Sequence, residues 1–195
     1  MAGASVSVRR STIKLLLILG TLLFGVRVEA QAPMGEPQVK AMFVYNFLKF
    51  VEWPGETSLG AKDPFVVLII GEGATADATE RFLESKTIGE RPLVVFRTQW
   101  DQSLAGARAV FVVERDAKKL RRILDAAAAA GVLTIGEGEK FTTSGGVIGL
   151  LVEDRKMRFD VDTSAAQSAG LRVSSKLLAL TRVVHSSTDR PGTQE

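Results

Sequence analysis

Residues 65–76 read F-V-V-L-I-I-G-E-G-A-T-A, and this stretch decides the fold class. Its first six residues form an uninterrupted apolar run, which is typical of a strand covered on both faces. Gly71 and Gly73 end the run, and residues 75–86 follow as a predicted helix. A buried strand, a glycine-containing turn and a helix are the start of an α/β unit with a parallel sheet.

The same alternation of strands and helices continues downstream. Further strands are predicted at 92–96, 109–113 and 132–135. Between the last two, Asp116 is the predicted N-cap of a helix that runs to Ala130 and ends at Gly131. Strands that alternate with helices favour parallel pairing, because each helix carries the chain back across the sheet.

The C-terminal part follows a different pattern. Residues 147–152 and 157–161 flank a charged turn at 153–156, which predicts an antiparallel hairpin. Residues 163–184 are predicted to be helical, with a break or a bend around Gly170 and Leu171. The predicted fold is therefore α/β: a single three-layer domain, with a mostly parallel central sheet, a C-terminal antiparallel hairpin and flanking helices.

Upstream of residue 65, residues 38–53 contain no helix breaker before Pro54 and Gly55, which predicts a helix of about four turns. Its aromatic side chains are Phe43, Tyr45, Phe47, Phe50 and Trp53. Packing in the core is one explanation for them. The other is a partner or a second copy, because a helix on one sheet face buries only part of its circumference.

The first thirty residues are predicted to be a cleaved signal peptide. Arg9, Arg10 and Lys14 precede the short apolar run 15–26, and residues 28–30 read V-E-A, with small residues at −3 and −1. This predicts export to the periplasm, with no membrane insertion after cleavage. Residues 31–37 are a predicted flexible lead-in, 38–185 the domain and 186–195 a disordered tail.

Charge and composition exclude several classes of function. The 195 residues include 25 Lys and Arg, 22 Asp and Glu, one His and no Cys. Cleavage removes four basic side chains and one acidic one, which leaves 21 of each. A neutral mature chain does not favour nucleic-acid binding. Without Cys and with a single His, thiolate metal sites, disulfides, Cys nucleophiles and His-rich sites are excluded.

Motifs that could carry chemistry have simpler explanations. Gly71, Gly73 and Ala76 form a G-x-G-x-x-A pattern between a strand and a helix, as in dinucleotide sites. However, Arg97 ends the next strand, where such a site usually has an acidic residue, so the pattern is read as a turn that needs glycine. The stretch 142–146, T-T-S-G-G, could be a small anion-binding nest but is read as a tight turn.

The carboxylates and the histidine give no catalytic constellation. Glu153 with Asp154, and Asp160 with Asp162, are pairs that could do acid–base work, but solvated charge is the favoured interpretation. His185 is predicted to be an exposed cation at a helix end. No nucleophile–base pair and no metal-ligand cluster is visible, so no catalytic residue, cofactor or metal is predicted and the chain is not predicted to be an enzyme.

Several strings resemble a known family. The stretch 40–54, K-A-M-F-V-Y-N-F-L-K-F-V-E-W-P, is similar to the opening helix of YfiR-like periplasmic proteins. The segments that agree downstream are 132–136, 141–149 with its Gly pair, 158–162 and 169–178 (A-G-L-R-V-S-S-K-L-L). The resemblance covers roughly residues 38–184.

The resemblance implies a function beyond what the residues show by themselves. Members are small periplasmic α/β domains that tend to dimerise, and the best-known role is repression of an inner-membrane diguanylate cyclase, which lowers cyclic di-GMP and biofilm formation. Other members occur beside sensor kinases or outer-membrane proteins. Some carry disulfides for which redox sensing has been proposed, and this chain, without Cys, departs from that pattern.

Two hypotheses follow from these observations. In the first, the chain represses a diguanylate cyclase or another signalling protein, and it forms a homodimer as members of the family tend to do. Its candidate partner or dimer contacts are Phe43, Phe47, Phe50, Trp53, Arg172 and Lys176. In the second, the chain is a small-ligand sensor module acting with a sensor kinase. It would use the crevice at the carboxyl ends of the parallel strands, near Gly71, Gly73 and Gly136.

Overall fold

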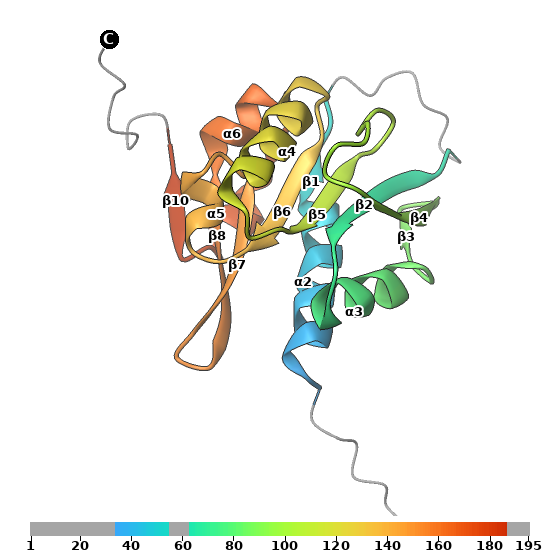
Figure 1. The fold of residues 1–195 in the computed structure, drawn as a ribbon. Coiled ribbons are helices and arrows are strands. Elements are labelled where there is room, and N and C mark those ends of the chain that lie inside the picture. The colour runs from blue at the N-terminus through green and yellow to red at the C-terminus, as the bar shows by residue number, and fades with distance from the viewer. Residues whose placement is uncertain (1–33, 55–62, 187–195) are drawn as a thin grey trace, which may run out of the picture. The chain divides into compact units, whose positions relative to one another are not determined.

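The computed structural model of the chain describes residues 34–54 and 63–186 (Figure 1). The predicted signal peptide and nearly all of the predicted tail lie outside the described residues. The strands are β1 (Val51–Glu52), β2 (Phe65–Gly71), β3 (Thr87–Ile88), β4 (Arg91–Thr98), β5 (Ala109–Val113), β6 (Leu133–Glu137), β7 (Ile148–Glu153), β8 (Lys156–Asp162), β9 (Arg172–Val173) and β10 (Val183–His185). The helices are α2 (Glu36–Phe50), α3 (Ala74–Leu83), α4 (Ala117–Ala129), α5 (Lys140–Thr143), α6 (Thr163–Ser168) and α7 (Ser175–Leu178).

The central sheet confirms the predicted fold class. Its eight strands lie in the order β10-β8-β7-β6-β5-β2-β4-β3. Strands β4, β2, β5, β6 and β7 are parallel, and β7–β8 is the predicted antiparallel hairpin. Its turn residues Asp154 and Arg155 both have positive φ, the conformation of a tight two-residue hairpin turn. The hairpin is not the edge of the sheet, because β10 pairs in parallel with the outer side of β8.

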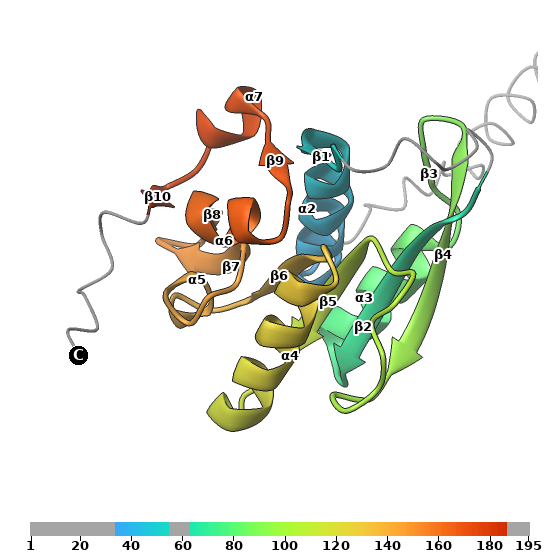
Figure 2. The same cartoon turned by 90° about the horizontal axis from the view of Figure 1, so that it is seen from above.

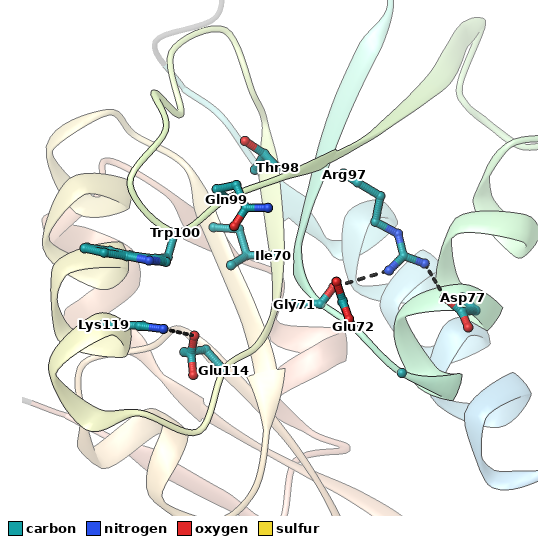
Figure 3. A pocket seen from close by; sticks show the side chains of 11 residues that line it. Ile70, Gly71, Glu72, Asp77, Arg97, Thr98, Gln99, Trp100, Glu114 and Lys119 are labelled. Atoms are coloured by element: carbon teal, nitrogen blue, oxygen red, sulfur yellow. Dashed lines mark hydrogen bonds and ion pairs between the residues drawn. The ribbon is translucent and has the colours of Figure 1, made fainter.

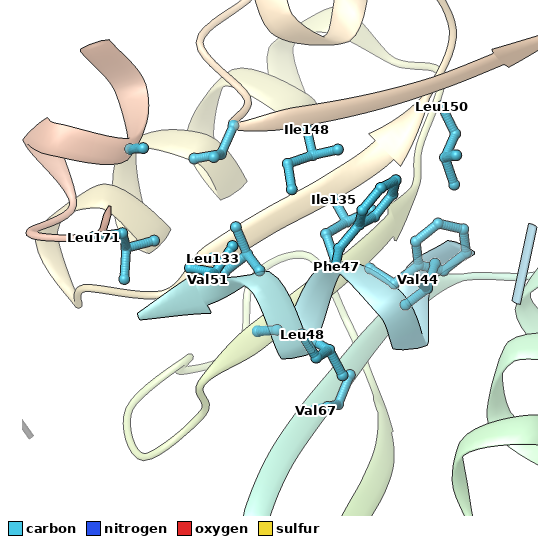
Figure 4. Close-up of a cluster of buried hydrophobic side chains, with 14 of the residues drawn as sticks. Val44, Phe47, Leu48, Val51, Val67, Leu133, Ile135, Ile148, Leu150 and Leu171 are labelled. Carbon is cyan, nitrogen blue, oxygen red and sulfur yellow. The ribbon is translucent and has the colours of Figure 1, made fainter. Parts of the chain in front are cut away.

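Helices cover both faces of the sheet (Figure 2). Alternate residues of β5 show why: Ala109 and Phe111 lie in the core beneath α2 and α3, whereas Val110 and Val112 lie in a second core beneath α4. The first core joins α2 to β2, β6 and β7 through side chains such as Val44, Phe47 and Leu48 (Figure 4). An apolar strand without alternation is therefore buried on both sides, as the sequence predicts.

The boundaries of the first two helices differ from the predicted ones. Helix α2 begins at Glu36, with Pro37 in its first turn, so part of the predicted lead-in is helical. It ends at Phe50 because Val51 is extended and pairs with Val173 in the two-stranded sheet β1–β9. Helix α3 covers residues 74–83 and stops before β3, a short strand that the sequence analysis did not predict. For α4, the Asp116 carboxylate accepts hydrogen bonds from the N–H groups of Lys118 and Lys119, which confirms the predicted cap.

The C-terminal segment 163–184 has the predicted break at Gly170, but most of the helix predicted on either side of it is wrong. The segment is divided into α6, β9, α7 and β10, because Gly170 has a φ of +68° and ends α6. After it, Ser174 caps the short α7, and Arg182 leads into β10. The apolar residues of this segment have separate environments: Leu171 and Leu177 are buried in the core, whereas Leu180 is exposed. Their spacing therefore does not represent one helical face.

Candidate functional site

A cleft of about 770 Å³ lies where three parallel strands end (Figure 3). It is lined by Ile70, Gly71, Glu72, Gly73, Asp77, Arg97, Thr98, Gln99, Trp100, Glu114 and Lys119. These residues lie at or just beyond the carboxyl ends of β2, β4 and β5, or belong to the first turns of α3 and α4. After β2, the chain adds β4 on one side of β2 and then returns to add β5 on the other side. The direction in which successive strands are added to the sheet therefore reverses at β2. Ligands of open α/β sheets bind at such reversal points.

The two glycines of the cleft have local structural roles. Gly71 has a φ of +102°, and a Cβ there would lie 2.3 Å from the carbonyl oxygen of Val113 on β5. Only glycine therefore allows β2 to end this close to β5. Gly73 has a φ of +113° and is the N-cap residue of α3. Both positions agree with the interpretation of the G-x-G-x-x-A pattern as a turn that needs glycine.

Arg97, at one wall of the cleft, forms ion pairs with two acidic side chains. Its guanidinium lies 2.6 Å from Asp77 Oδ1 and 2.9 Å from Glu80 Oε2, and it donates to the carbonyl of Gly71 at 3.3 Å. Burial by itself lowers the pKa of Arg97, but the hydrogen bonds and charges of Asp77 and Glu80 outweigh it and raise the pKa. Arg97 thus fastens the end of β4 to α3 rather than offering a free cation to a ligand.

The opposite wall carries an aromatic ring with two cations beside it, which the sequence analysis missed. Lys119 Nζ lies 5.8 Å from the centroid of the Trp100 ring, and the Arg122 guanidinium carbon lies 5.6 Å from it. Glu114 Oε2 is 4.0 Å from Lys119 Nζ. Trp100 follows β4 and Lys119 lies in the first turn after β5. The rule that ligands bind beyond the carboxyl ends of parallel strands could have identified both.

A second hollow, of about 410 Å³, lies farther along the same edge of the sheet. Lys40 of α2 lines it and is buried, with its Nζ 2.8 Å from Glu36 Oε1 and 3.1 Å from Glu137 Oε2. Burial by itself lowers the pKa of Lys40, but these two carboxylates outweigh it and raise the pKa. The contact fastens α2 to the end of β6.

The Lys40 contact predicts a pH dependence of stability. Lys40→Met should lower the free energy of unfolding by about 2 kcal/mol, because hydrogen bonds to charged groups are lost. A raised folded-state pKa means that this contribution is complete below the unfolded pKa and is lost as the pH rises through the folded value. Urea unfolding should therefore show that the unmodified chain and Lys40→Met differ in free energy of unfolding by a constant amount between about pH 6 and pH 9. This difference should shrink above about pH 10.5. The exposed Lys118→Met is the control, and an equal shrinkage there would contradict the assignment.

The aromatic residues of α2 are mostly explained by the core. Phe47 is 1% exposed, and its ring centroid is 5.0 Å from that of Phe159. Phe43 and Phe50 are partly buried against the same core. Packing within the chain therefore accounts for Phe47 without a partner, whereas Phe43 and Phe50 keep some exposed surface.

Trp53 is also fixed by contacts within the chain. Its Nε1–H donates to the carbonyl of Arg108 at 3.2 Å, and its ring meets that of Phe65 edge-on at 5.2 Å. Both contacts cross to the amino ends of the parallel strands. Trp53 is partly exposed, but these two contacts within the chain are enough to explain its position.

Arg172 and Lys176 both fall within the predicted helix 163–184, but they do not lie on one helix in the structure. Arg172 lies in β9, opposite Glu52 of β1, and Lys176 lies in α7. Both are exposed. The backbone N–H of Ser174 donates to the carbonyl of Phe50 at 2.9 Å, so the β9–α7 segment is attached to the end of α2. Strand pairing, not helical spacing, thus brings the segment that carries both cations to the end of α2.

Gly136 belongs to the packing of one phenylalanine and does not line either hollow. A Cβ at Gly136 would lie 2.1 Å from one edge of the Phe141 ring, and a Cβ at Gly146 would lie 2.1 Å from the other. The ring thus lies between two glycines. This accounts for the T-T-S-G-G stretch at 142–146, which contains the end of α5 and a turn, as the sequence analysis favoured over an anion nest.

One of the two carboxylate pairs and the histidine need correction. Asp160 and Asp162 are buried, not solvated: Asp160 accepts two hydrogen bonds from Arg182, and Asp162 caps α6 by accepting from the N–H of Ala165. His185 lies in β10 rather than at a helix end, and its carbonyl accepts from Thr163 Oγ1 at 3.0 Å. Among the described residues, no group of three His, Asp or Glu side chains could hold a metal ion.

Comparison with known families identifies the chain. The model of the YfiR/HmsC-like family matches residues 37–182, which is most of the chain and all of the central sheet except β10. The chain belongs to the YfiR/HmsC-like family. Members of this family are regulatory proteins rather than enzymes. No curated protein matches this YfiR/HmsC-like chain.

Solved structures share the fold of this YfiR/HmsC-like domain. A conserved domain protein from Vibrio cholerae O1 biovar El Tor str. N16961 is 10% identical, with a TM-score of 0.52 over 77% of this chain and 60% of that one. An ABC domain in complex with L-Trp, from Streptococcus pneumonia, is 7% identical, with a TM-score of 0.51 over 76% and 60%. The chain thus spans about 60% of the length of both. At these identities the likeness concerns the fold alone. No helix among the described residues is long and apolar enough to span a membrane.

Proposed function

We propose that this YfiR/HmsC-like chain is a periplasmic regulator that holds an inner-membrane diguanylate cyclase inactive and so lowers cyclic di-GMP. The family match over residues 37–182 carries the proposal. A regulator of this kind shifts its target only by binding the inactive conformation more tightly than the active one. The chain would therefore act through a binding surface, which needs no catalytic group.

The end of α2 is the surface that supports this proposal. Phe50 is partly exposed there, and Arg172 and Lys176 are exposed on the β9–α7 segment that is attached to it, with Arg172 opposite Glu52. A partly buried aromatic flanked by positive charge is the composition of an interface centre with a polar rim. We propose contact with an acidic, apolar-centred surface of the sensor domain of the target.

Deletion of the gene tests the function. Cyclic di-GMP should rise several-fold in a strain that lacks the gene and return to its original level when the gene is restored. Restoration with a chain carrying Arg172→Glu and Lys176→Glu should fail, whereas Lys118→Glu with Arg155→Glu, two exposed cations elsewhere, should succeed. An unchanged cyclic di-GMP level in the deletion strain would contradict repression of a cyclase.

The cleft beside Trp100 favours a second candidate function, a small-ligand sensor module acting with a sensor kinase. The volume of about 770 Å³ is within the range of small-molecule sites, and the position at the strand reversal is the usual one for this fold class. Trp100 offers a partly exposed ring face, and Lys119 offers a cation that is only weakly paired. These features support a planar ligand with an anionic group.

A thermal-shift screen separates the two candidates. If the cleft binds a ligand, an amino acid, nucleotide or phosphate should raise the melting temperature saturably, because a ligand that binds only the folded state stabilises it. Trp100→Ala should abolish that rise without a large loss of stability, since Trp100 is partly exposed. A rise that persists in Trp100→Ala would place the binding outside the cleft.

A further inference from the structure

The second hollow, beside Lys40, has no part in the functions proposed above. Its volume of about 410 Å³ is within the range of small-molecule sites. It lies beyond the carboxyl ends of β5 and β6 and beside β7, at the edge where open α/β sheets bind their ligands. Its lining shares only Glu114 with the cleft beside Trp100. The hollow is therefore a separate candidate site.

Three charged side chains of the hollow are paired with one another. Lys40 Nζ lies 2.8 Å from Glu36 Oε1 and 3.1 Å from Glu137 Oε2, so one cation is shared between two carboxylates. The second oxygen of Glu137, Oε1, is buried and has no hydrogen-bond partner among the described residues. Buried polar atoms normally have such a partner. A ligand that brings N–H donors would therefore be favoured beside Glu137.

Arg115 and Glu139 are two opposite charges in the same lining that are not paired. Val112 of β5 pairs with Gly136 of β6, and each of the two charges lies three residues beyond its member of this pair. Because neighbouring strands are about 4.8 Å apart, the two residues leave the sheet at neighbouring points. Within residues 34–54 and 63–186, neither side chain has an ion-pair or hydrogen-bond partner, and both are exposed. The hollow thus offers one free cation and one free anion.

The remaining wall of the hollow is aliphatic. Val113 of β5 and Leu151 and Val152 of β7 contribute to it, and no aromatic side chain belongs to the lining. Val152 is 47% exposed, although it lies in a strand. An aliphatic group packed against this wall would remove its apolar surface from water. The wall therefore favours a branched aliphatic group over a ring that needs a stacking partner.

The geometry points to a site for a free α-amino acid with an aliphatic side chain. The Arg115 guanidinium binds the ligand carboxylate, with which arginine forms two parallel hydrogen bonds. Glu139 and Glu137 accept hydrogen bonds from the ligand ammonium group, which has three N–H donors. The aliphatic side chain packs on the wall from β5 and β7. A ligand with both charges fits this hollow better than a simple anion or cation, because the free charges have both signs.

Isothermal titration calorimetry with the purified chain tests the ligand class. L-Leucine or L-valine should bind saturably at one site. Leucinamide, which lacks the carboxylate, and isocaproate, which lacks the ammonium group, should each bind about tenfold more weakly than leucine or less, because one charge-assisted contact is lost. Glycine should also bind more weakly, since it has no side chain for the aliphatic wall. No saturable binding of either amino acid, or equal binding of leucine and one of its two analogues, would overturn the inference.

Substitutions in the hollow test its location. Arg115→Gln and Glu139→Gln should each weaken leucine binding about tenfold, whereas Lys118→Gln, at an exposed cation outside the hollow, should leave it unchanged. Because the substituted residues are exposed, circular dichroism should show that the variants remain folded. Trp100→Ala should also leave leucine binding unchanged. Full binding in Arg115→Gln and Glu139→Gln, or its loss in Trp100→Ala, would contradict the assignment. Neither result depends on repression of a cyclase or on a ligand in the cleft beside Trp100.

Discussion

Asp160→Ala is expected to lower the free energy of unfolding by about 3 kcal/mol, because it removes one partner of a buried ion pair. The Asp160 side chain is 2% exposed, and its two carboxylate oxygens accept from Arg182 Nε at 3.0 Å and Nη2 at 2.6 Å. Hydrogen bonding to Asp160 raises the pKa of Arg182. The pair fixes the start of β10 against β8, so its loss should also release β10.

The control for Asp160 is an ion pair of the same chemistry on the surface. Arg121 and Asp125 are one turn apart on α4, 3.2 Å between Nε and Oδ1, and both are about 70% exposed. Asp125→Ala should cost less than about 0.5 kcal/mol, because water screens exposed pairs. Urea unfolding measures both variants. Equal losses, or a loss for Asp160→Ala below about 1 kcal/mol, would contradict the structural role given to the Asp160–Arg182 pair.

Phe141→Ala is expected to have the largest effect, about 4 kcal/mol, since truncation of a buried phenylalanine leaves a large cavity. Phe141 is 3% exposed and lies between Gly136 and Gly146. Gly136→Ala should cost about 3 kcal/mol by overpacking, because the added methyl group would lie 2.1 Å from the Phe141 ring. Gly136 has no positive φ, so the backbone alone would accept alanine.

A double-mutant cycle tests this explanation of the glycine. In the Phe141→Ala background, Gly136→Ala should cost less than about 1 kcal/mol, because the ring that it would meet is gone. Urea unfolding of the two single variants and the double variant gives the coupling energy. If the two losses simply add, the conflict between the methyl group and the ring is not the reason for glycine at position 136.

The sequence could predict the strands that are buried on both faces and the helix whose ends are set by local signals. Residues 65–70 and 109–113 are apolar without alternation because both faces of the sheet are covered there. Asp116 and Gly131 mark the ends of α4 by local hydrogen bonding and backbone conformation. The C-terminal segment could not be predicted in this way. Leu171 and Leu178 have a helix-like spacing of seven residues, but the burial of Leu171 depends on β9 pairing with β1, more than a hundred residues earlier in the chain.

The candidate sites show the same division between local and distant causes. Gly71 and Gly73 were identified because a turn after a strand is a local feature. The grouping of Trp100 with Lys119 depends on two separate strands ending at one edge, which requires the strand order. The burial of Phe47 and the exposure of Phe96, which is 53% exposed in β4, depend on which helices exist and what they cover. Residue type alone could not separate these two phenylalanines.

The most direct measurement is cyclase activity in spheroplasts, whose periplasmic membrane face is open to added protein. Spheroplasts from the deletion strain would receive the purified chain, and their cyclic di-GMP would be measured over time. We predict that the unmodified chain lowers cyclic di-GMP several-fold, and that the chain with Arg172→Glu and Lys176→Glu does not. A folded, unmodified chain that leaves cyclic di-GMP unchanged would contradict repression of an inner-membrane cyclase from the periplasmic side.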